Sequence, residues 1–91
     1  MGSMVALKFK IMPASPNEDL NRIEKESEEI VVRYGGRVYG KERENIAFGL
    51  VAILLTVGWE EKQDSSILEL EIRKIKGVQS AEIIDIRRGI G

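Results

Sequence analysis

The stretch Asn45–Gly58 reads NIAFGLVAILLTVG, and its nearly unbroken apolar run decides how the chain can fold. A strand with one face on the core and the other in water alternates apolar and polar residues. This stretch hardly alternates, so it is either a buried central strand or a strand whose second face meets something outside the chain. One parity carries the bulky set that best suits a helix-covered face: Val51, Ile53, Leu55 and Val57. The other parity, on the open face, carries Phe48, Leu50, Ala52, Leu54 and Thr56.

The residues before this stretch predict a strand and then a helix. Residues 5–11 alternate in polarity, as a half-buried strand requires. The helix has either Ser15 or Asn17 as its N-cap, and its apolar residues keep helical spacing as far as Tyr34. Gly35-Gly36 then supplies the left-handed residues at which such a helix ends.

Charge marks the segment between that helix and the apolar run. Residues 37–43 are short, charged and interrupted by Gly40, which is typical of an edge strand that must not recruit a neighbour. We expect residues 41–45 to form the turn that leads back into the apolar strand.

A second helix and a last strand complete the pattern. Ser65-Ser66 followed by Glu69 predicts the start of a helix, and Gly77 predicts its end. One face of this helix carries Leu68, Ile72 and Ile75. Residues 78–88 form the last strand, in which the apolar parity changes after Ile83, so we expect a β-bulge there.

These elements follow one another as β-α-β-β-α-β, the ferredoxin-like α+β arrangement. With right-handed crossovers, the first and third strands lie at the centre of a four-stranded antiparallel sheet, and both helices cover one face. The 91 residues suffice for a single domain, residues 1–91, with one small core. Met1–Ser3 are either native or a cloning remnant, since Met4 can itself be a start.

Composition removes several classes of function. Fourteen Lys and Arg against fifteen Asp and Glu leave a net charge of -1, so the chain as a whole attracts neither nucleic acid nor an anionic membrane. The absence of Cys and His excludes disulfides, thiolate or imidazole metal sites and Ser-His or Cys-His nucleophiles. No carboxylates stand out as a catalytic dyad, so we expect no enzyme, metal or cofactor. The apolar run is too short for a membrane span, which is typical of a soluble cytoplasmic protein.

Two local features suggest a contact outside the chain. Phe48 stands beside Gly49 where a charged turn becomes the apolar strand. Either the ring serves a partner, or it folds over the sheet end as part of the core while Gly49 relieves crowding. Arg87-Arg88 ends the last strand, and the pair either binds a partner or only solubilises the chain.

The ordered set of these motifs resembles the translation elongation factor 1-beta family, most closely its short stand-alone archaeal form. The resemblance runs from Val5 to Arg88. It is carried by four pieces in order: Asp19-Leu20 after the Met-Pro ending of the first strand, Gly36-Arg37-Val38-Tyr39-Gly40, Ile46-Ala47-Phe48-Gly49-Leu50, and Val78-Gln79-Ser80 leading to Asp85-Ile86-Arg87-Arg88.

The resemblance implies a protein that promotes GDP release from elongation factor 1-alpha without covalent chemistry, as a monomer when free. Arg88 aligns with a Lys that in eukaryotic relatives reaches the partner's magnesium and phosphate region, and Arg87 is the alternative. Phe48-Gly49 aligns with an aromatic-Gly pair that touches the partner. We expect one end of the sheet to present both groups, with Lys8, Lys10 and Arg87 as steering charges.

Two other functions remain open on this fold. One is a regulatory or ligand-sensing module that forms a homodimer through the open sheet face. The other is an RNA-binding sheet, which needs aromatic side chains on the open face and a basic surround, and for which only Phe48 is suitably placed.

Overall fold

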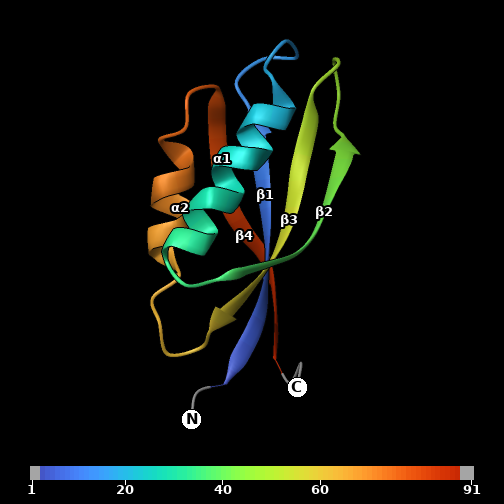
Figure 1. The fold of residues 1–91 in the computed structure, drawn as a ribbon. Helices are drawn as coiled ribbons and strands as arrows, with labels where there is room; N and C mark the ends of the chain where they lie inside the picture. The colour runs from blue at the N-terminus through green and yellow to red at the C-terminus, as the bar shows by residue number, and fades with distance from the viewer. Residues whose placement is uncertain (1–2, 89–91) are drawn as a thin grey trace.

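The computed structural model describes residues 3–88, so Met1, Gly2 and residues 89–91 of the predicted single domain lie outside the described residues. The elements are β1 (Met4–Pro13), α1 (Leu20–Arg33), β2 (Arg37–Asn45), β3 (Val51–Glu60), α2 (Ser66–Arg73) and β4 (Val78–Arg88) (Figure 1). The strands pair antiparallel in the order β2-β3-β1-β4, so β1 and β3 are central. This confirms the expected ferredoxin-like fold.

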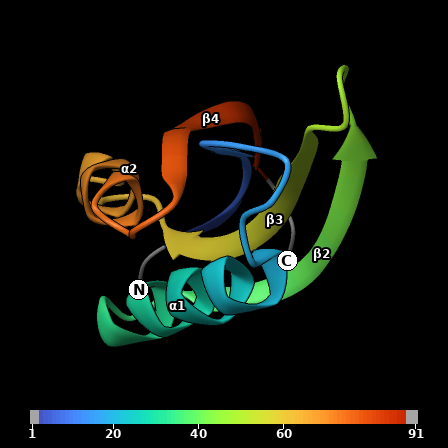
Figure 2. The ribbon, with the colours of Figure 1, turned by 90° about the horizontal axis from the view of Figure 1, so that it is seen from above.

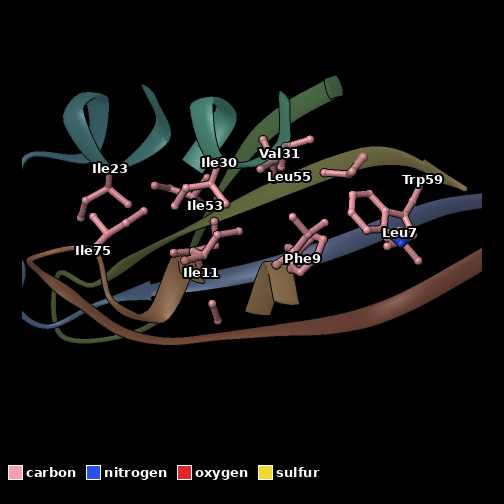
Figure 3. Close-up of a cluster of buried hydrophobic side chains, with 14 of the residues drawn as sticks. Leu7, Phe9, Ile11, Ile23, Ile30, Val31, Ile53, Leu55, Trp59 and Ile75 are labelled. Atoms are coloured by element: carbon pink, nitrogen blue, oxygen red, sulfur yellow. The ribbon is translucent and has the colours of Figure 1, made fainter. Parts of the chain in front are cut away.

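The molecule has two layers, because both helices pack against one face of the twisted sheet and leave the other face open (Figure 2). The core lies between the layers (Figure 3). Its members include Leu7, Phe9 and Ile11 of β1, Ile23, Ile30 and Val31 of α1, Ile53, Leu55 and Trp59 of β3, and Leu68 and Ile72 of α2. The bulky parity of β3 therefore faces the helices as expected, although Val51 at the start of the strand is only half-buried.

Helix α1 begins later than the sequence suggested. Its N-cap is Asp19, whose Oδ1 accepts a hydrogen bond from the Arg22 N–H at 3.2 Å. The assignments to Ser15 and Asn17 are wrong. Ser15 Oγ instead accepts from the Asn17 N–H at 3.2 Å, so it stabilises a turn ahead of the helix.

Replacing Asp19 with alanine should lower the free energy of unfolding by about 1 kcal/mol, because the Arg22 N–H loses its acceptor. Urea unfolding followed by circular dichroism measures this loss. Asn17→Ala is the matched control and should change the free energy of unfolding by less than about 0.5 kcal/mol. A larger loss for Asn17→Ala than for Asp19→Ala would contradict the cap assignment.

The edge strand β2 is longer than expected, and residues 41–45 are not the turn. They pair with β3 from Lys41 opposite Leu55 to Asn45 opposite Val51. The charges that resembled a turn have partners across the molecule. Ion pairs join β2 to α1 through Lys41 and Glu28 and through Arg43 and Glu24, and join β2 to β1 through Glu42 and Lys8 and through Glu44 and Lys10. The turn therefore lies at residues 46–50, and Phe48 and Leu50 are not part of the strand.

The second half of the chain follows the expectations with two corrections. Ser65 occupies the N-cap position of α2 but makes no side-chain cap bond. The carboxylate of Asp64 accepts from the Ser66 N–H at 2.9 Å, and this bond lowers the pKa of Asp64. Helix α2 ends at Arg73, ahead of Gly77, which has a φ of +93° in the turn before β4.

The bulge expected in the last strand is confirmed. The pairing of β4 with β1 shifts register between Lys8, which is opposite Asp85, and Phe9, which is opposite Ile83. Ile84 is the extra residue. The shift explains why the apolar parity of β4 changes along its length.

Candidate functional site

The tip, residues 46–50 between β2 and β3, has a tightly defined backbone. The Ile46 N–H donates to the Leu50 carbonyl, and the Leu50 N–H donates to the Ala47 carbonyl, each at 2.9 Å. Phe48 and Gly49 have φ values of 54° and 80°. Two successive residues with positive φ are characteristic of a type I′ turn, whose twist matches that of the flanking strands.

Phe48 is an unusual residue for the first position of such a turn. It is the one non-glycine residue with a positive φ among residues 3–88, and it is 97% exposed. A left-handed backbone costs a residue with a Cβ about 1–2 kcal/mol, and an exposed ring returns none of this through packing. The interpretation of Phe48 as a core residue is therefore wrong. A strained and exposed ring is instead typical of a residue kept for a contact outside the chain.

The other candidate group, Arg87 and Arg88 at the end of β4, is the arginine end. Arg87 lies opposite Ala6 on the open face, and Arg88 lies opposite Val5 on the face that the helices share. Nε of Arg87 is 3.0 Å from an oxygen of Asp85, on the same strand and the same face. Both guanidinium side chains remain largely exposed, Arg87 by 78% and Arg88 by 74%.

Arg88 also has a partner that the sequence did not indicate. Its Nη1 lies 2.6 Å from Oε2 of Glu61, the residue that follows β3. Because β1 lies between β3 and β4, the pair forms only when three strands are assembled. No local pattern in the sequence predicts an ion pair between residues on two strands that are not neighbours in the sheet.

The tip and the arginine end lie at opposite ends of the sheet. Since β3 and β4 both run antiparallel to β1, they run in the same direction, and the start of β3 is far from the end of β4. The ten residues of β3 separate the two ends by about 30 Å (Figure 1). The expectation that one sheet end presents both the ring and the guanidinium is therefore wrong.

The steering lysines of the sequence prediction lie between the two ends, on the open face of β1. Lys8 Nζ is 4.0 Å from a carboxylate oxygen of Glu42, and Lys10 Nζ is 3.3 Å from one of Glu44. On the other side, Lys8 lies opposite Asp85 and Lys10 opposite Glu82 in β4. The open face thus has a basic central row between two acidic rows. Such a surface disfavours a polyphosphate chain, because phosphates would meet the acidic rows as well as the lysines.

An open groove of about 720 Å³ lies along α1 and reaches Lys41 of β2, whose Nζ is 2.8 Å from a carboxylate oxygen of Glu28 in the groove. The bond to Glu28 raises the pKa of Lys41. Across residues 3–88, no three acidic side chains gather closely enough to hold a metal ion. Neither of the two helices described has the length and apolar composition of a membrane span.

Comparison with known proteins gives matches along nearly the whole chain. The family model described as "EF-1 guanine nucleotide exchange domain" matches residues 6–88. Elongation factor 1-beta of Methanothermobacter thermautotrophicus is 36% identical over 89 residues, which cover 97% of this chain and 98% of that protein. Elongation factor 1-beta of Halorubrum lacusprofundi is 34% identical over 85 residues, which cover 92% of this chain and 96% of that protein. Elongation factor 1-beta of Methanococcus vannielii is 29% identical over 87 residues, which cover 94% of this chain and 97% of that protein. The matched region includes both the tip and the arginine end.

Proposed function

Because the chain belongs to the family of EF-1 guanine nucleotide exchange domains, we propose that it promotes GDP release from elongation factor 1-alpha during translation elongation. Proteins of this family are nucleotide exchange factors and not enzymes. The observation that carries the proposal is the match to residues 6–88 together with full-length archaeal relatives named elongation factor 1-beta. The proposal places the chain in the cytoplasm, where elongation takes place, as a monomer when free.

In the proposed mechanism, a basic side chain of the arginine end enters the partner's nucleotide site. A GTPase holds its nucleotide largely through phosphate contacts and a bridging magnesium ion. A guanidinium placed there competes with the metal for the same negative charge and so weakens the grip on GDP. Arg88 is our candidate for this role, and Arg87 lies on the other face of the strand as the alternative.

The tip serves the same partner at a second point in this proposal. Phe48 presents a nearly complete ring to solvent, and aromatic side chains of this kind dominate the binding energy of protein interfaces when a pocket receives them. Gly49 adopts the second positive φ of the turn and places no side chain beside the ring. Phe48 then anchors the complex while Arg88 acts about 30 Å away.

Selectivity follows from linkage. If this protein binds the emptied partner more tightly than the GDP-loaded one, then this protein must weaken the binding of GDP to the partner by the same factor. In this proposal the tip and the arginine end contribute differently to affinity and to selectivity. The tip binds both forms of the partner equally, whereas the arginine end discriminates because only the loaded form holds phosphate and magnesium. Lys8 and Lys10 contribute to the approach of the two proteins.

Release of a fluorescent GDP analogue from purified elongation factor 1-alpha tests the proposal. Added in substoichiometric amounts, this chain should accelerate release severalfold or more and should act repeatedly, since an exchange factor is not consumed. Release at the spontaneous rate in the presence of excess chain would reject the function. The homodimer alternative has less support, because the open face is crossed by charged rows and not by an apolar patch.

A further inference from the structure

Glu61 lies beside the guanidinium of Arg88, and its backbone is held in place. It immediately follows β3, and its backbone N–H donates to the Ser3 carbonyl at 2.8 Å, so the chain is held at this point. From there its carboxylate reaches across β1 to within 2.6 Å of the Arg88 guanidinium. The side chain of Glu61 is one-third exposed and that of Arg88 about three-quarters, so the acid lies deeper than the cation it holds.

We propose that Glu61 is the residue that makes the arginine end selective for the emptied partner. This inference rests on the proposed entry of Arg88 into the nucleotide site. Glu61 stays with Arg88 and neutralises its charge, so the GDP phosphates of a loaded site attract the pair less than they would attract Arg88 alone. The affinity for the loaded form therefore falls relative to the affinity for the emptied form.

Stability alone does not account for the contact. Exposed ion pairs contribute little to folding, since water screens the charges and two long side chains lose freedom. The Arg87–Asp85 contact is an ordinary surface ion pair, because both residues lie on β4 and the pair connects no second strand. The Glu61–Arg88 pair joins the ends of two different strands and holds a carboxylate against the guanidinium.

The direction of the effect follows from like charges. A carboxylate brought close to phosphate in a partly desolvated site raises the free energy of the loaded complex. The same carboxylate in an emptied site meets no phosphate. Repulsion of the wrong partner is a recognised means of specificity, and here it acts against one state of a single partner.

The test replaces Glu61 with glutamine, which keeps the size and removes the charge. Affinities for nucleotide-free and GDP-loaded elongation factor 1-alpha are measured by calorimetry or fluorescence anisotropy. We expect Glu61→Gln to reduce the preference for the emptied form about tenfold, chiefly by tighter binding to the loaded form, and to slow GDP release accordingly. Glu61→Asp, which keeps the charge, should retain most of the preference. Glu29→Gln removes an exposed carboxylate of α1 and is the matched control.

The outcomes separate this inference from the function on which it rests. If Glu61→Gln preserves the ratio of the two affinities while Arg88→Ala abolishes accelerated release, Glu61 has no part in selectivity and the role of Arg88 stands. If Glu61→Asp loses as much preference as Glu61→Gln, the residue acts by position and not by charge, and the repulsion is refuted. If Arg88→Ala leaves release unchanged, the role of Arg88 itself fails. Thermal unfolding midpoints equal to that of the unmodified chain show that each variant is folded.

Discussion

Replacing both Arg87 and Arg88 with alanine should abolish the accelerated release of GDP from elongation factor 1-alpha while leaving the fold intact. Truncating a charged group that acts in a desolvated interface typically costs 2–5 kcal/mol, which corresponds to about 30-fold to several thousandfold in rate. The fold should survive because both side chains are exposed and their ion pairs lie at the surface. The measurement is the release rate of a fluorescent GDP analogue at saturating exchange factor.

Single variants assign the effect to one side chain. We expect Arg88→Ala to account for most of the loss and Arg87→Ala for little, because the two residues lie on opposite faces of β4. Arg88→Lys should keep part of the activity, since an ammonium retains the charge but loses the planar fork. Full activity in the double alanine variant would reject the arginine end as the intruding group. Loss confined to Arg87→Ala would transfer the role to that residue.

Replacing Phe48 with asparagine should weaken binding to elongation factor 1-alpha by about 2 kcal/mol or more and, in the same molecule, stabilise the fold by about 1 kcal/mol. Binding weakens because the ring is lost from the tip. The fold gains because asparagine tolerates the left-handed backbone at this position, where φ is 54°. The opposite signs are the distinctive part of this prediction, since a residue kept for packing would lose stability when truncated.

Two measurements and one control variant test whether Phe48 is the anchor. Urea unfolding gives the change in stability, and titration with the nucleotide-free partner gives the change in affinity. Val32→Asn is the control, because Val32 of α1 is also an exposed apolar side chain, 64% accessible, but lies on the helix layer away from the tip. A destabilised Phe48→Asn, or equal losses of affinity for the two variants, would contradict the assignment of Phe48 as the anchor.

Most of the fold could be predicted because hydrophobic periodicity reports directly on which side of an element is covered. In β3, the parity of Ile53, Leu55 and Val57 identified the helix-covered face, and the change of parity after Ile83 located the bulge. Both signals depend on burial within a single element. They are therefore visible without knowledge of what the element contacts.

The errors arose where polar side chains choose among partners. The sequence offered Ser15 and Asn17 as caps of α1, but Asp19 forms the cap while Ser15 stabilises its own turn. Charges at residues 41–45 resembled a turn, yet they belong to an edge strand whose acids and bases pair with α1 and β1. Composition cannot distinguish these outcomes, because the same residue types favour caps, turns and exposed edges.

The sequence indicated which residues belong to the candidate site but not how they are arranged in space. Phe48 and the arginines were identified locally, and their separation depends on the directions of three strands considered together. The exposure of Phe48 and the strain at its backbone also required the structure, since a ring at a sheet end packs inward as readily as outward. Glu61 gave no signal, because its contact with Arg88 crosses an intervening strand.

The rigid central strands limit how the distance between the two ends can change during evolution. Unless a β-bulge absorbs it, an insertion of one residue in β3 would turn every later side chain to the opposite face, so a regular strand lengthens in steps of two residues. Matching insertions in β1 would then be needed to maintain the pairing. Each such step lengthens the molecule by about 7 Å, a coarse increment compared with the fit of a protein interface. If both ends contact one partner as proposed, adjustment to that partner comes from side chains at the two ends and not from the length of the strands.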